Sequence, residues 1–172
     1  MTQKRPSDLE EDAGAGQADT DTLEYRRALS LFATGVSVVT AIDSEGNNVG
    51  ITVSSFNSVS LDPPLVLWSV GLESMSYEAF TSAEHFAVHV LGKGQEDLCD
   101  HFAKRIPEKF NGFELGSGLG VAPILPDFAA CFECSTEHVY PGGDHQIIVG
   151  RVHRFEYRDS EPLIIYRSQF LT

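Results

Sequence analysis

The sequence predicts a mainly β domain, in which antiparallel strands close into a barrel and a few helices pack outside it. Two observations support this expectation. Runs rich in valine, isoleucine and threonine recur along the chain, while few segments carry apolar residues at helical spacing. Many strands with few helices are typical of a barrel.

The order of the elements follows from the apolar pattern and from the turn residues between the runs. Helices are expected over 21–35, 73–83 and 94–104, and strands over 36–43, 49–60, 65–70, 85–91, 129–139, 145–157 and 162–167. Gly46 and Asn47 predict a hairpin between the first two strands. Residues 106–127 carry glycine and proline repeatedly, so this stretch is expected to be mostly loop.

Length and charge limit the classes of function. The 172 residues, 42% of them hydrophobic, suit one domain with a core of its own. A formal net charge of −13 argues against nucleic acid and anionic membrane surfaces as partners, and no apolar run reaches the roughly 20 residues of a membrane-spanning helix. A phosphate-bearing ligand would therefore need local donors rather than a basic surface.

The N-terminus and the cysteines indicate a cytoplasmic protein. Residues 1–21 have no apolar stretch and are interpreted as a disordered acidic tail, which leaves residues 22–172 as the domain. Cys99, Cys131 and Cys134 are expected to be free thiols in a reducing compartment.

Two patterns that resemble metal sites are interpreted as structural. In a strand, the residues of the C-x-x-C pair Cys131 and Cys134 point to opposite faces. His85 and His89 would lie together on a helix, but in a strand they are roughly 13 Å apart. We therefore expect no metal site.

Short polar side chains concentrate in the stretch from Gly50 to Pro64. Ser, Thr and Asn form turns and bulges where strands end, yet this many of them also suit a flat heteroaromatic ligand with edge carbonyls and ring nitrogens. Ser74 and Ser76 stand at the start of a predicted helix, where one of them is either a simple N-cap or a contact for an anion. The residue types alone leave both alternatives open.

A Gly-Gly turn followed by Asp144 and His145 opens the last long strand. The turn needs Gly142 and Gly143, which take positive φ without steric cost, but it does not need the imidazole. From these residues alone, Asp144 is a turn former and His145 an ordinary polar residue.

Five blocks of the sequence together resemble the short flavin reductases that serve two-component flavin monooxygenases, in the FMN-binding split-barrel superfamily. The blocks are "YRRALSLFATGVSVVTA", "GITVSSFNSVSLDPPLVLWSV", "HFAVHVL", "FAKRIPEKFNGFEL" and "GGDHQIIVGRV". The resemblance implies a homodimeric, six-stranded antiparallel split barrel of Greek-key type. It also implies an enzyme that uses NADH or NADPH to reduce FMN or FAD and releases the reduced flavin to a separate oxygenase.

The same resemblance assigns site residues. Those implied to contact the flavin are Thr34, Gly35, Val36, Ser37, Thr52, Ser54, Ser55, Asn57, Ser58, Ser74, Ser76, Phe86, Ala87, Phe102, Ala103 and Lys104. His145 is implied to line the nicotinamide site, with Asp144 orienting its ring by shaping the turn. His101 stands where the family often has arginine, which leaves Lys104, Arg105 or Lys109 to supply a positive charge.

The sequence gives little support to two other classes of enzyme. "GSGLGVA" at 116–122 lacks the third glycine and the βαβ context of a Rossmann dehydrogenase, and no G-x-S-x-G of a hydrolase occurs. A non-catalytic flavin-binding or storage protein on the same barrel stays an alternative. So does a flavoprotein with tightly held FMN that reduces another acceptor.

Overall fold

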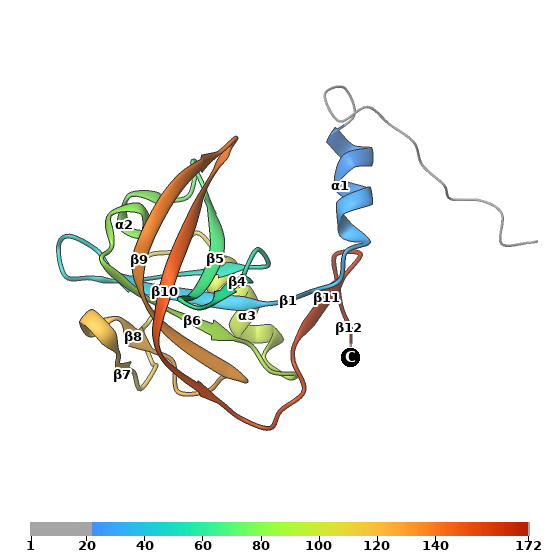
Figure 1. Cartoon of the computed structure of the whole chain (residues 1–172). Coiled ribbons are helices and arrows are strands. Elements are labelled where there is room, and N and C mark those ends of the chain that lie inside the picture. Colours follow the sequence, from blue (N-terminus) through green and yellow to red (C-terminus); the bar gives the residue numbers. More distant parts are fainter. Residues whose placement is uncertain (1–21, 172) are drawn as a thin grey trace, which may run out of the picture.

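The structure, a computed structural model, describes residues 22–171. These residues form a mainly β domain with three α-helices, α1 (Thr22–Ser30), α2 (Tyr77–Ser82) and α3 (Glu96–Ala103) (Figure 1). The three helices confirm those expected from the sequence. The predicted acidic tail, residues 1–21, lies outside the described residues.

Most strands belong to one antiparallel sheet. In spatial order its seven strands are β3 (Asn48–Val53), β2 (Ser37–Ile42), β6 (His85–Val90), β9 (Ala130–Gly142), β10 (His145–Tyr157), β5 (Pro64–Gly71) and β4 (Asn57–Leu61). Two small sheets accompany it. One contains β1 (Thr34–Gly35), β11 (Ile164–Tyr166) and β12 (Gln169–Leu171), and the other pairs β7 (Gly116–Ser117) with β8 (Pro123–Ile124).

The predicted six-stranded closed barrel is not confirmed. The main sheet has seven strands, and among the described residues no backbone ladder joins its two edge strands, β3 and β4. The extra strand arises because the run 49–60, expected to be one strand, is interrupted at Ser54–Phe56 and supplies both β3 and β4. Three residues span at most about 14 Å between the flanking Cα atoms, so the sheet must curl to bring its edges together.

The long β9–β10 hairpin connects the two halves of the sheet (Figure 1). The first residues of β9 pair with β6, and the first residues of β10 pair with β5. Gly150 lies where the hairpin crosses the core, and a Cβ at this position would collide with the ring of Phe86. A side chain at position 150 would therefore displace the Phe86 ring from the core.

The cysteines are buried in separate parts of the core. Cys134 packs with the cluster around Trp68 and Phe86, while Cys131 packs in another cluster with Phe128. The two side chains therefore lie on opposite faces of β9, as strand geometry predicts. Burial raises the pKa of both thiols to about 12, so almost no thiolate forms near neutral pH.

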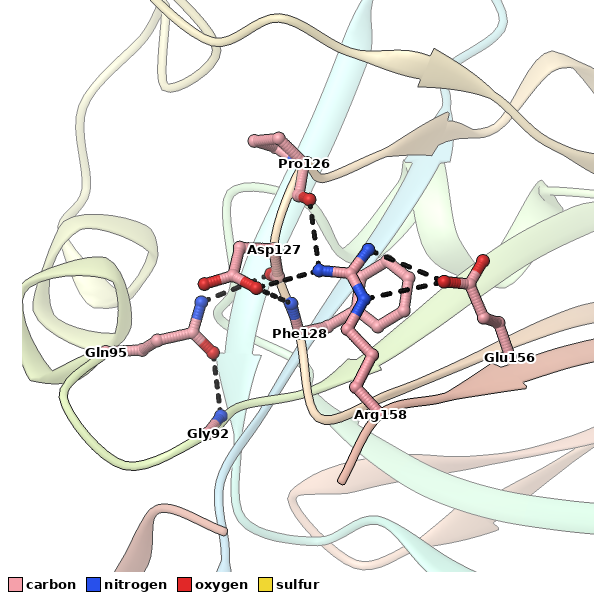
Figure 2. A network of polar contacts seen from close by, with 7 residues as sticks. All are labelled: Gly92, Gln95, Pro126, Asp127, Phe128, Glu156 and Arg158. Carbon is pink, nitrogen blue, oxygen red and sulfur yellow. Dashed lines mark hydrogen bonds and ion pairs between the residues drawn. The ribbon is translucent and has the colours of Figure 1, made fainter. Parts of the chain in front are cut away.

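A polar network fixes the far end of β10 (Figure 2). The guanidinium of Arg158 lies 4.1 Å from the centre of the Phe128 ring and donates to Asp127 Oδ1 at 2.8 Å. Gln95 then links the loop before β9 to the start of α3, because it accepts from the Gly92 amide and donates to the Asp127 carbonyl. The network joins three segments that are distant in the sequence.

Helix α1 stands apart from the sheet, next to the small sheet of β1, β11 and β12 (Figure 1). The amide of Arg167 donates to the carbonyl of Ser30 at 2.8 Å, which fixes the end of the helix. None of its residues is buried, and Leu23, Leu29 and Phe32 are exposed. Within residues 22–171, no helix has the length and apolar composition that a membrane span requires.

His89 is a neutral core residue. Its side chain is fully buried, Nδ1 donates to the Val38 carbonyl at 3.2 Å, and Nε2 accepts from the Leu125 amide at 3.1 Å. These two bonds need the neutral ring, because an acceptor nitrogen cannot carry a proton. Burial lowers the pKa of His89 to about 4. In the described part of the chain, no group of three His, Cys, Asp or Glu side chains could hold a metal ion.

The buried His89 predicts acid sensitivity. The unfolded chain takes up a proton at about pH 6.5 and the folded chain only at about pH 4, so stability falls as the pH drops through this window. Between pH 7 and pH 5, His89 should account for a loss of about 2 kcal/mol in the free energy of unfolding.

Urea denaturation at both pH values tests this prediction. The variant His89→Gln should lose about 2 kcal/mol less than the wild type between the two pH values. The control His138→Gln, at an exposed histidine, should follow the wild type. Identical pH dependence in His89→Gln and wild type would show that His89 does not titrate in this way.

Candidate functional site

A cavity of about 720 Å³ opens between β3, the loop from β5 to α2 and the segment after α3. This size lies within the range of small-molecule and cofactor sites. Five of the residues that the resemblance assigns to flavin or nicotinamide contact line it, namely Ser74, Ser76, Ala103, Lys104 and His145. Five residues from three distant segments thus come together at one place.

Asp144 and His145 form a hydrogen-bonded pair at the mouth of the cavity. Oδ1 of Asp144 accepts from Nδ1 of His145 at 2.7 Å, and this bond lowers the pKa of the carboxyl. Since Nδ1 then carries the proton, Nε2 of the neutral ring is an acceptor. Asp144 therefore orients the imidazole through its side chain, in addition to shaping the turn.

The backbone holds this pair against the end of β5. The amide of Leu72 donates to the Asp144 carbonyl at 3.0 Å, and His145 is paired with Gly71 in the sheet. A Cβ built on Gly71 would lie 3.6 Å from Nε2 of His145. A larger side chain at position 71 would therefore cover the face of the ring.

Ser74 and Ser76 line the same cavity as the cations. Ser76 occupies the N-cap position of α2, but its side chain makes no capping hydrogen bond. The Ser74 hydroxyl accepts from the Ser76 amide at 3.3 Å, which turns the loop into the helix. The N-cap alternative therefore does not account for the Ser76 hydroxyl.

The positive charge of the cavity comes from Lys104 and Arg105. Both are exposed lining residues, and neither forms an ion pair with another residue of the described range 22–171. Lys109 also lines the cavity, but its ammonium donates to the carbonyls of Gly50 and Phe102. Three residues were expected as alternative sources of positive charge, because His101 stands in place of an arginine. Two of them, Lys104 and Arg105, are available to a ligand.

The predicted serine block lies outside the cavity lining. Thr52 Oγ1 donates to the Cys99 carbonyl at 2.7 Å, and Ser55 Oγ accepts from the Ser69 amide at 2.9 Å. Both hydroxyls thus have partners within the fold, as the turn-and-bulge alternative predicts. The remaining members, Ser54, Asn57 and Ser58, are exposed where β3 ends and β4 begins.

Several other residues that were predicted to contact the flavin lie in the core instead of the cavity. Val36, Ser37, Phe86, Ala87 and Phe102 are buried, and none of them lines the cavity. Thr34 and Gly35 form β1, and Thr34 Oγ1 is buried without a hydrogen-bond partner among the described residues. Contact between these residues and a bound flavin stays a prediction.

The structure adds lining residues that sequence reasoning missed. They include Asn48–Ile51 of β3, Leu72, Glu73, Met75, Glu108 and Phe110. A Cβ on Gly50 would lie 2.7 Å from the Phe102 ring and 2.9 Å from the Phe110 ring, so only glycine fits the floor of the cavity. Gly50 and the "EKF" triplet both fall in the sequence blocks that carry the family resemblance. Their residue types alone did not indicate that they would line a cavity.

The chain was then compared with known families and curated proteins. Residues 29–172 match the family described as flavin reductase like domain. The FMN reductase (NADH) SmoA of Agrobacterium fabrum is 45% identical over 146 residues, which cover 85% of this chain and 83% of that protein. The reductase subunit HsaB of a flavin-dependent monooxygenase of Rhodococcus jostii is 37% identical, with 95% of this chain and 84% of that protein covered.

Some relatives are longer than this chain. The match spans 49% and 59% of two proteins of Rhizobium meliloti, the second of them the reductase subunit Stc3 of stachydrine N-demethylase. Solved structures agree with the fold. The NADH:FAD oxidoreductase SgcE6 of Streptomyces globisporus, in complex with NAD and FAD fragments, is 34% identical with a TM-score of 0.86, and the match covers 93% of this chain and 96% of that one.

The two adjacent serines of the strand break should differ in their effect on stability. Ser55→Ala removes the hydroxyl that bonds the Ser69 backbone and should lower the free energy of unfolding by about 1–3 kcal/mol. Ser54→Ala is the matched control at an exposed neighbour and should change it by less than about 0.5 kcal/mol. Urea denaturation measures both, and equal losses in the two variants would contradict this assignment.

Proposed function

Because the chain belongs to the flavin reductase-like family, we propose that it is an NAD(P)H-dependent flavin reductase that reduces FMN or FAD by hydride transfer. The observation that carries this proposal is the meeting of His145, the Ser74–Ser76 loop and the Lys104–Arg105 pair around one cavity. Hydroxyls and cations suit the phosphate of a flavin, and the imidazole lines the same cavity.

The residues of the cavity fit a flavin nucleotide. The chain carries a net charge of −13, so long-range attraction for a phosphate is absent and local donors must hold it. The exposed Lys104 and Arg105 and the hydroxyl of Ser76 provide such donors. When bound, the flavin ring supplies the chemistry, because it accepts a hydride from the nicotinamide.

His145 would then position the nicotinamide. Its Nε2 is an acceptor held in place by Asp144, and its side chain is 49% exposed. An acceptor of this kind can bind the N–H of a carboxamide. No acid or base is required of the protein, since hydride transfer depends on the distance and orientation of the two rings.

The named relatives support the remaining parts of the proposal. SmoA is an FMN reductase that uses NADH, and HsaB is the reductase subunit of a monooxygenase. We infer by this similarity that the present chain delivers reduced flavin to a separate oxygenase. The buried thiols, without a disulfide among them, fit the reducing cytoplasm.

We also propose a homodimer. Helix α1 has no buried residue, yet it carries the exposed apolar side chains Leu23 and Leu29, and Phe32, two residues after the helix, is exposed as well. A helix with such a surface gains little stability within one copy of the chain. A second copy that covers it would bury this surface.

Kinetics of a His145 variant test the proposed function. The wild type should oxidise NADH steadily when FMN is present. His145→Ala should lower kcat/KM for NADH roughly tenfold, or about 1.4 kcal/mol, and leave the Kd for flavin within about twofold. His138→Ala, on the same hairpin but outside the cavity lining, should behave as the wild type.

Two outcomes would contradict the assignment of His145. If folding yield and flavin affinity fall together in His145→Ala, the residue only stabilises the turn. If neither constant changes, other groups place the nicotinamide. A wild type that binds flavin but never oxidises NADH would instead favour the storage protein.

Light scattering tests the homodimer. The wild type should have about twice the mass of one 18.8 kDa chain at micromolar concentration. The double variant Leu29→Asp, Phe32→Asp should be a monomer with an unchanged circular dichroism spectrum in the β region, because α1 adds no buried residue to the core. A monomeric wild type with full reductase activity would refute this proposal.

A further inference from the structure

Lys109 lines the cavity and connects its own segment to β3 and α3. Its Nζ donates to the Gly50 carbonyl of β3 at 3.1 Å and to the Phe102 carbonyl of α3 at 2.7 Å. The ammonium is partly buried, and burial lowers its pKa. A lysine is seldom buried unless its charge has partners, so these two bonds fix the side chain in place.

The backbone of Lys109 is held as well. Nε2 of His101 donates to the Lys109 carbonyl at 2.6 Å, and the His101 ring packs against Phe102 and Phe113 with centroids 5.2 Å and 5.5 Å apart. Phe110 packs edge-on against Phe102 at 5.2 Å. The chain from Lys109 onward is thus anchored by polar bonds and by packed rings.

The segment before Lys109 makes few other hydrogen bonds to the rest of the protein. It consists of residues 104–108, which include both cations of the cavity. No hydrogen bond joins Arg105, Ile106 or Pro107 to another residue in the described range, and all three are exposed. The position of the cations therefore depends on the anchors at the two ends of the segment.

We propose that Lys109 and His101 form a clasp that positions the cationic wall, so that Lys104 and Arg105 meet the phosphate of the flavin while Lys109 itself does not touch it. This inference rests on the proposed function. It gives the histidine at position 101, where the family often has arginine, a role: it bonds the Lys109 carbonyl rather than the ligand. Lys109 is thus a positioning residue.

Flavin binding in a double-mutant cycle tests the clasp. Lys109→Met keeps the aliphatic stem and removes the ammonium, and it should weaken FMN binding roughly tenfold. Riboflavin, which lacks the phosphate, should bind within about twofold of wild type. In the background Lys104→Met, Arg105→Met, the same change should alter FMN affinity by less than about twofold, because the wall it positions no longer carries charge. Lys93→Met, an exposed lysine outside the cavity lining, is the matched control and should bind both flavins as the wild type does.

A ligand-free measurement separates the clasp from the proposed function. Trypsin should cleave after Lys104 and Arg105 several-fold faster in Lys109→Met than in wild type, since the segment loses its anchor. Mass spectrometry identifies the cleavage sites. An unchanged rate there would overturn the clasp even if no flavin binds, whereas a wild type that neither binds nor reduces flavin would overturn only the proposed function.

Three outcomes of the binding measurements would also overturn the inference. Additive losses in the cycle would mean that Lys109 contacts the phosphate directly. An unchanged FMN affinity, or an equal loss for riboflavin, would mean that it does not position the wall. If Lys109→Met fails to fold, His101→Ala is tested instead, which removes the bond to the Lys109 carbonyl together with the ring contacts to Phe102 and Phe113. The same cycle and the same digestion are then measured, with the same expected directions.

Discussion

The link of three residues between β3 and β4 is the constraint on which the rest of the structure depends. These two strands are the opposite edges of a seven-stranded sheet, so a flat sheet would place β3 and β4 roughly 29 Å apart. The link at Ser54–Phe56 forbids this arrangement, and Ser55 fixes it to the backbone of Ser69. The sheet therefore curls, and residues of β3 and of the end of β5 face one cavity.

Curling of the sheet also explains the placement of the small residues. Gly50 lies under the rings of Phe102 and Phe110, and Gly150 lies against Phe86. In both cases an aromatic ring occupies the space that a Cβ would need. Close packing of this kind lets helix α3 approach β3, and the segment that follows α3 then becomes a wall of the cavity.

Local sequence patterns predicted most elements, because their signals are short-range. Apolar runs and turn glycines located the three helices and the β9–β10 hairpin within a few residues. The break at Ser54–Phe56 could not be predicted in this way. It is stabilised by a hydrogen bond to a strand 14 residues away, and a run of Ser, Val and Asn has the same local preference whether it forms one strand or two.

The candidate site likewise contains residues that the sequence identified and roles that it could not show. His145, Ser74, Ser76 and Lys104 line the cavity, and their contact with a flavin or a nicotinamide stays a prediction. Thr52 and Ser55 have partners within the protein instead, since residue type does not show whether a hydroxyl faces a ligand or closes a turn. The roles of Lys109 and His101 depend on backbone carbonyls of other elements, which no sequence pattern displays.

Hydrogen exchange with and without saturating FMN tests the central claim most directly, because it locates the bound flavin on the chain without any substitution. The account predicts slower exchange of backbone amides in 71–76 and 104–110, the two walls of the cavity. Exchange in 130–135, where β9 lies between β6 and β10, should not change. Protection confined to segments outside the cavity, with 71–76 and 104–110 unchanged, would contradict the account.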